Sequence, residues 1–144
     1  MDHELGPPIA ERALVRAGRK GQLTVRLGAP KKAQDVDWVC PYQILGLRDS
    51  KVGAAYGVDA LQALMMALEK IRVRLEKAGS GYTWLGGDAG FPRLVPSYFG
   101  AAFATRINQQ IDRELARFGK ALKPKRKRPL GNGKPEDARR ARRR

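Results

Sequence analysis

The chain has 144 residues, which is enough for one domain with a real core but not for two. Lysine and arginine number 29 against 14 acidic residues, giving a formal charge of +15. The single cysteine, Cys40, excludes a framework of intramolecular disulfides. No apolar run approaches the roughly 18 residues that a membrane span needs, and the polar start of the chain has no secretory signal pattern. We therefore expect a soluble, cytoplasmic protein.

The charge is concentrated at the C-terminus. Residues 120–144 contain 12 basic and 2 acidic residues, a net charge of +10, whereas residues 1–119 carry a net charge of +5. A segment so charged and without aromatics cannot bury enough apolar surface to order itself. We predict a disordered basic tail over residues 119–144, a disordered lead over residues 1–8, and a single α+β domain over residues 9–118.

Four segments show the features of strands. Residues 9–17 and 22–27 are separated by Gly18–Gly21, a suitable hairpin connection, and the second segment alternates cleanly between apolar and polar side chains. Residues 36–45 form a third segment, in which Pro41 requires a bulge or an edge because proline has no amide hydrogen. Residues 52–56 form a short fourth one. The order predicts an antiparallel meander of about four strands.

A long helix follows at residues 59–78. Asp59 is suited to the N-cap, with Gln62 as its capping-box partner. Arg72 lies near the edge of the apolar stripe, where we expect its stem to pack at the core margin. The stripe itself should cover the sheet, with residues at helical spacing: Leu61, Leu64, Met65, Leu68, Ile71 and Leu75.

A second helix is predicted from Ser97, as its cap, to about Phe118, with Gly119 beyond it. Between the two helices lie a short strand at Tyr82–Leu85 and a glycine-rich loop. Five apolar residues of the second helix recur every fourth position, so they form a ridge inclined to the helix axis: Phe99, Phe103, Ile107, Ile111 and Leu115. Such a ridge suits a helix that lies obliquely on its support, or one that docks with another copy of itself.

Enzymatic chemistry has little support. The only histidine, His3, lies in the predicted lead, which argues against a histidine-based triad or a multi-histidine metal site. Cys40 lies on the apolar face of a predicted strand, where a buried thiol is more common than a nucleophile. Asp35 and Asp37 are best explained as solvated acids at a strand edge. We expect no metal, no cofactor and no catalytic residues.

Two segments are candidate binding surfaces. The glycine-rich loop carries aromatic, acidic and basic groups around a flexible backbone, as binding loops often do, although ordinary loop chemistry also explains it: Trp84, Asp88, Phe91 and Arg93. The tail suits association with any polyanion through counterion release, without base-specific readout, although it also suits a purely solubilising role. Its candidate binding residues are Lys123, Lys125, Arg126, Lys127, Arg128, Arg139, Arg140, Arg142, Arg143 and Arg144.

Three motifs resemble a small bacterial domain family of unknown function. They are Asp37-Trp38-Val39-Cys40-Pro41-Tyr42-Gln43-Ile44, Gly57-Val58-Asp59-Ala60-Leu61-Gln62-Ala63-Leu64, and Trp84-Leu85-Gly86-Gly87 with Gly90-Phe91-Pro92. The resemblance implies a bacterial origin and a compact α+β unit. It implies no activity and no catalytic residues.

These observations favour an accessory protein that associates with nucleic acid or another polyanion through its tail. The alternative is a protein–protein binding module, such as a toxin-system or regulatory partner or a homodimer, that uses the second helix and the Trp84–Arg93 loop. An enzyme is the third possibility, and it would require a deep pocket lined by acidic residues. No membrane association is expected.

Overall fold

The computed structural model describes residues 3–18, 20–33, 37–79, 81–95 and 97–122. The chain divides into two compact units, Met1–Val95 and Pro96–Arg144, and each is described by itself. The division falls after Val95, whereas the sequence predicts one domain that continues to residue 118. The disorder predicted for the tail concerns residues that, beyond Leu122, lie outside the described ranges.

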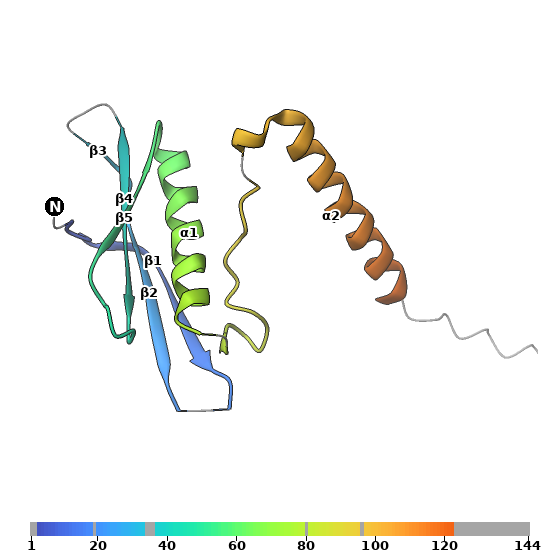
Figure 1. Cartoon of the computed structure of the whole chain (residues 1–144). Helices are drawn as coiled ribbons and strands as arrows, with labels where there is room; N and C mark the ends of the chain where they lie inside the picture. Colours follow the sequence, from blue (N-terminus) through green and yellow to red (C-terminus); the bar gives the residue numbers. More distant parts are fainter. Residues whose placement is uncertain (1–2, 19, 34–36, 80, 96, 123–144) are drawn as a thin grey trace, which may run out of the picture. The chain divides into compact units, whose positions relative to one another are not determined.

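The first unit is built on an antiparallel sheet, as predicted (Figure 1). Its meander consists of β1 (Pro8–Arg16), β2 (Gln22–Gly28), β4 (Trp38–Leu45) and β5 (Gly53–Gly57), each paired with the next. Two short strands complete it: β3 (Lys31–Lys32) pairs with the start of β4, and β6 (Tyr82–Thr83) pairs with the end of β1. The strand expected at Tyr82–Leu85 therefore joins the sheet, two residues shorter than predicted.

Pro41 lies inside β4, and the ladder on one side of the strand is interrupted there. The pairing with β2 ends at Tyr42, and the pairing with β3 begins at Val39. Pro41 therefore has no register partner on that side, and its register partner on the other side is Ala54. A residue without an amide hydrogen fits this gap between two ladders.

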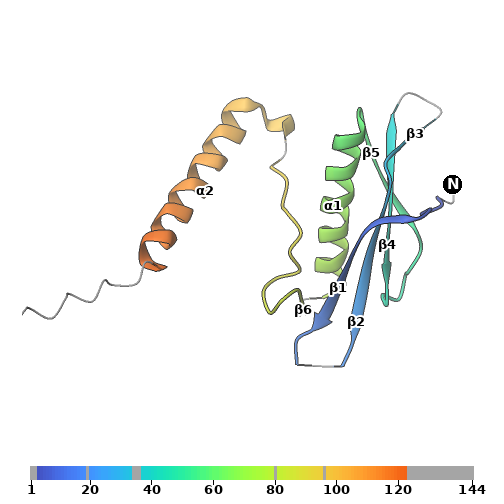
Figure 2. The same ribbon diagram turned by 180° about the vertical axis from the view of Figure 1, so that it is seen from behind.

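Helix α1 (Ala60–Lys77) covers one face of the sheet (Figures 1 and 2). Its cap is the one that the sequence predicts: the Asp59 carboxylate accepts a hydrogen bond from the Gln62 amide at 2.7 Å. The Gln62 side chain accepts in turn from the Val58 amide at 2.7 Å. The start of the helix is thus set by local side-chain hydrogen bonds.

The buried stripe of α1 differs from the predicted one. Ala63, Ala67, Ile71 and Leu75 are buried, whereas Leu61 and Met65 are 66% and 42% exposed. The prediction was wrong for Leu61 and Met65 because the helix and sheet approach too closely for large side chains at its first turns. A Cβ on Gly57 would lie 2.4 Å from the Ala63 amide nitrogen. Only small residues fit at this contact.

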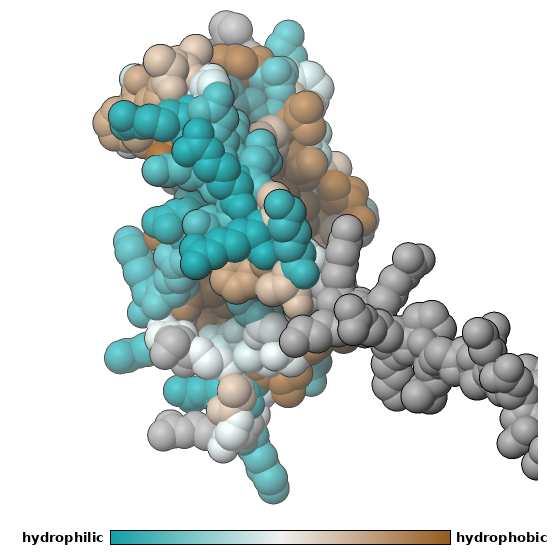
Figure 3. Space-filling model, turned by 90° about the vertical axis from the view of Figure 1, so that its right-hand side faces the viewer, coloured by the Kyte–Doolittle hydropathy of each residue, from teal (hydrophilic) through white to brown (hydrophobic). Residues whose placement is uncertain are grey.

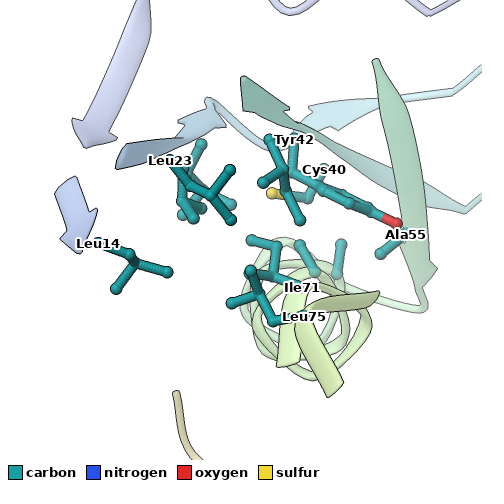
Figure 4. Packing of buried hydrophobic residues seen from close by; sticks show 12 residues of the cluster. Leu14, Leu23, Cys40, Tyr42, Ala55, Ile71 and Leu75 are labelled. Carbon is teal, nitrogen blue, oxygen red and sulfur yellow. The ribbon is translucent and has the colours of Figure 1, made fainter. Parts of the chain in front are cut away.

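The core lies between α1 and the sheet (Figure 4). Leu14, Leu23 and Ile44, from three neighbouring strands, are fully buried and belong to this core cluster. Ile71 and Leu75 meet them from α1, where the larger side chains of the buried stripe are found. The contact is therefore tight at the start of the helix and filled by larger side chains toward its end.

Residues 3–7, predicted as part of a disordered lead, have defined contacts with the sheet. The His3 ring packs edge-on against the Tyr56 ring with centroids 6.0 Å apart, and His3 Nε2 lies 3.1 Å from the Tyr56 hydroxyl. The Leu5 carbonyl lies against Gly28 of β2. Pro8, also assigned to the lead, is the first residue of β1.

The second unit contains a short 3-10 turn, η1 (Ser97–Phe99), and the long helix α2 (Ala101–Leu122). The second helix is thus confirmed, but both predicted ends were wrong. Gly100, with a φ of 88°, separates Ser97 from the helix, and Gly119 lies within it. Tyr98, Phe99 and Phe103 stack in sequence, with centroids 4.4 and 4.9 Å apart. Neither α1 nor α2 is long and apolar enough to cross a membrane.

The assignment of the buried face of α1 can be tested by enlarging one buried side chain and truncating one exposed side chain. We expect Ala63→Leu to lower the free energy of unfolding by about 2 kcal/mol, because overpacking forces the helix from the sheet. Leu61→Ala should change it by less than about 0.5 kcal/mol, since Leu61 is exposed. Urea unfolding of both variants measures these values. The opposite ranking would restore the stripe predicted from sequence.

Candidate functional site

The loop after β6 begins with a tight turn. The Gly87 amide donates to the Trp84 carbonyl at 3.0 Å, and the Trp84 amide donates to the Asp88 carbonyl at 2.9 Å. Both central residues, Leu85 and Gly86, have positive φ, 52° and 79°, as in type I′ turns. Positive φ is costly for a leucine, and this one is 85% exposed. The turn therefore holds a strained, solvent-facing apolar residue.

Arg12 of β1 holds this loop against the sheet. Its guanidinium lies 4.2 Å from the ring centroid of Trp84 and 4.8 Å from that of Phe91. Its Nη1 donates to the backbone carbonyls of Ala89 at 3.2 Å and Gly90 at 2.5 Å. A planar guanidinium suits this place because it stacks on aromatic rings while donating at its edge.

Gly90 is required at the centre of this contact. Its φ is 71°, and a Cβ there would lie 2.8 Å from both Arg12 Nη1 and Trp84 Cε3. A side chain would push the arginine from the ring or the loop from the strand. Gly90 and Phe91 are thus both explained by packing around Arg12.

The structure brings together only part of the predicted loop site. Trp84 and Phe91 meet on Arg12, while the Asp88 carboxylate accepts from the Gly90 amide at 2.7 Å and so shapes the same loop. Arg93 is exposed, and its charge acts on Glu69 of α1. Sequence reasoning missed Arg12, although its alternation with buried Leu14 placed it on the helix side of the sheet.

A second arginine cluster lies where the segment after the loop runs beside α1 (Figures 1 and 2). Arg72 pairs with Glu69 at 2.6 Å and also with Glu76, and the Leu94 amide donates to Glu69 at 3.4 Å. The hydrogen bond from Arg72 is the main reason why the pKa of Glu69 is lowered. Arg72, predicted as a snorkelling residue, is instead held in an ion-pair network.

A cleft of about 340 Å³ lies between these groups and the loop. Its walls include Arg72 and Glu76 from α1, Tyr82 from β6, and Asp88 and Phe91 from the loop. The Arg72 charge is already balanced by two carboxylates, so the cleft offers aromatic and backbone surface more than free charge. The cleft thus combines this surface with the carboxylates of Glu76 and Asp88, and its size is that of a small-ligand pocket.

Cys40, His3 and Asp37, the described residues that the sequence offered for catalysis, do not line this cleft. Cys40 is fully buried, its thiol donates to the Gly28 carbonyl at 3.5 Å, and burial raises its pKa to about 11. His3 contacts Tyr56. Asp37 is exposed, and Asp35 lies outside the described residues. Within the described ranges, no three His, Cys, Asp or Glu side chains are grouped to hold a metal ion.

The predicted polyanion-binding residues, Lys123 to Arg144, lie outside the described residues. The last described turn of α2 contributes Lys120, which is exposed.

A family model described as a domain of unknown function, DUF6968, matches residues 10–93. The match covers more than half of the chain, so the protein belongs to this family, which confirms the expected domain of unknown function. The matched region contains the sheet, α1, Arg12 and the loop, and it ends close to the boundary of the first unit. No curated protein and no solved structure matches the chain.

The contribution of Arg12 can be measured directly. We expect Arg12→Ala to lower the free energy of unfolding by about 2 kcal/mol, because it removes the stacking and two charge-assisted hydrogen bonds. Arg12→Lys should recover only part of this loss, since an ammonium cannot stack between two rings and donate sideways. Arg48→Ala, at an exposed arginine, is the matched control. Equal unfolding midpoints for the Arg12 and Arg48 variants would contradict this role.

Proposed function

We propose that the protein is a non-enzymatic accessory protein that associates with nucleic acid through the basic segment at its C-terminus. The observation that carries this proposal is the distribution of charge: residues 120–144 hold a net charge of +10, against +5 for the rest of the chain. When the lysines and arginines of this segment neutralise phosphates, the counterions of the nucleic acid are released, and this release supplies most of the affinity. The segment has no aromatic residues, so it offers no stacking platform for base-dependent binding.

The described part of the chain is compatible with a nucleic-acid contact made by the C-terminal segment and not by the family domain. Three arginines of the family domain make structural contacts: Arg12 with the loop, Arg72 with the two glutamates, and Arg26 with Glu11 at 2.7 Å. Helix α2 then adds the exposed cations Arg106, Arg113 and Arg117, beside the acidic Asp112 and Glu114, before the basic segment begins at Lys120. Cationic surface for a polyanion therefore increases toward the C-terminus.

Binding of labelled DNA and RNA at increasing salt tests the proposal. The full chain should bind single and double strands of unrelated sequence, with an affinity that falls steeply as salt rises, by a slope of about −0.9 per neutralised phosphate on duplex DNA. A chain ending at Leu122 keeps α2 but lacks residues 123–144, and its affinity should lose most of this dependence on salt.

Two controls sharpen the result. A full-length variant with every Lys and Arg after residue 122 changed to Gln should behave like the truncated chain, whereas a variant with the same residues in scrambled order should bind like the wild type. Equal binding by the truncated chain, or no binding by the full chain at low salt, would refute the proposal.

The alternative, a protein-binding module such as a regulatory or toxin-system partner, is favoured by a different observation. Leu85 is 85% exposed in a backbone conformation that leucine rarely adopts, beside the 41% exposed Trp84. Strain of this kind is often kept at binding sites. On the face of the molecule shown in Figure 3, apolar residues gather in areas separate from the hydrophilic ones. A partner for the loop would contact Leu85 and Trp84 directly.

Leu85→Asn tests whether this strain serves binding. Asparagine tolerates positive φ, so we expect the free energy of unfolding to rise by about 1 kcal/mol. If the loop binds a protein, the same variant, immobilised, should fail to retain whatever the wild type retains. A loss of stability would show that Leu85 contributes to the fold, which would remove the ground for this alternative.

A further inference from the structure

One side of α2 carries two parallel rows of residues. The apolar row is Phe103, Ile107, Ile111 and Leu115, at steps of four. A polar row runs beside it, three positions further along the helix from each of the first three apolar residues. Its members, all exposed, are Arg106, Gln110 and Glu114. The apolar row is itself poorly covered at its C-terminal half, where Ile111 and Leu115 are 47% and 66% exposed.

The polar row is self-complementary. It reads cation, amide, anion along the helix, with Gln110 at its centre. A second α2 running in the opposite direction, related by a two-fold axis near Gln110, would place each Arg106 opposite the other copy's Glu114. The same arrangement sets Ile107 beside Ile111 and Phe103 beside Leu115 of the other copy. One operation thus pairs the charges and covers the apolar row.

We propose that α2 is the interface of a homodimer, formed by antiparallel pairing of two α2 helices about Gln110. The charges favour a second copy running antiparallel over a parallel one, because a parallel pair would set Arg106 against Arg106 and Glu114 against Glu114. Among the residues that the structure describes, the ion pair of Glu114 is a long, exposed one with Arg117, at 3.9 Å. Such a surface pair contributes little and leaves the carboxylate free to change partner.

The stability of α2 also favours a second copy. Most helical stability in proteins comes from the packing of an apolar face and not from the propensity of the residues alone. Among residues 97–122, the part of its own unit that the structure describes, α2 packs at its first turns, where Phe99 stacks on Phe103. A second α2 supplies the missing contact over the rest of the helix.

Sedimentation velocity of the full chain, treated with nuclease, measures the association. The wild type should form a dimer that dissociates on dilution. Arg106→Glu and Glu114→Arg should each weaken the dimer at least tenfold, since each creates two like-charge pairs. The double variant Arg106→Glu/Glu114→Arg should associate like the wild type, and a mixture of the two single variants should form a heterodimer.

Cysteine cross-linking tests the axis. Gln110→Cys should form a disulfide-linked dimer under mild oxidation, while Gln109→Cys, about 100° further round the helix, should not. Buried Cys40 provides the background in both. The chain ending at Leu122 should dimerise as the full chain does, which keeps this result independent of nucleic-acid binding.

A wild type that stays monomeric at all concentrations would overturn the proposal. So would a dimer that is indifferent to both single charge reversals, since its interface would then lie elsewhere. Circular dichroism of each variant separates loss of association from loss of fold, because unfolding of the family domain would remove the signal of α1 and the sheet together.

Discussion

The close approach of α1 to the sheet determines how the first unit is built. Gly57 ends β5 directly under the first turn of the helix, and the Ala63 amide leaves no room for a Cβ there. Because the two backbones are this close, the helix must present Ala63 and Ala67 to the sheet and reserve Ile71 and Leu75 for the wider end. The larger residues Leu61 and Met65 are consequently turned outward. The Asp59 cap fixes where the helix begins, and so fixes this phase.

Arg12 attaches the glycine-rich loop to the edge of the sheet. Only two residues of β6 pair with β1, which is too little to hold the following residues. The guanidinium adds two aromatic contacts and two carbonyl acceptors from the loop. The result is an ordered loop that displays Leu85 at its tip and forms one wall of the cleft. The features that first suggested a binding loop are therefore partly structural: Trp84 and Phe91 are packing partners of an arginine.

The sequence predicts those features that depend on neighbouring residues. Alternation and turn residues identify the four strands of the meander, and Asp59 with Gln62 identifies the helix start, because each signal is local. The buried face of α1 was mispredicted because hydrophobicity favours burial of Leu61 and Met65 over alanines. The short distance between the helix and the sheet decides instead that the alanines are buried. Arg12 was missed because its partners Ala89 and Gly90 lie more than 75 residues away in sequence. At α2, Ser97 and Gly119 gave plausible helix ends, but a backbone turn at Gly100 and continued helix through Gly119 overrode them.

The two proposals constrain each other through geometry. Each α2 ends at Leu122, directly before the basic segment, and a helix of 22 residues is about 33 Å long. In an antiparallel pair the two basic segments therefore begin at opposite ends of the pair. The Debye length at physiological salt is about 8 Å, so the two starting points are several Debye lengths apart. A parallel pair would start both segments at the same end and make them repel, since residues 123–144 of each copy hold 11 basic and 2 acidic residues, a net charge of +9. Antiparallel pairing avoids this cost and presents two cationic segments to one polyanion, so that the second contact becomes intramolecular and strengthens the first. The charge that motivates the nucleic-acid proposal thus favours the same helix direction as the Arg106 and Glu114 row.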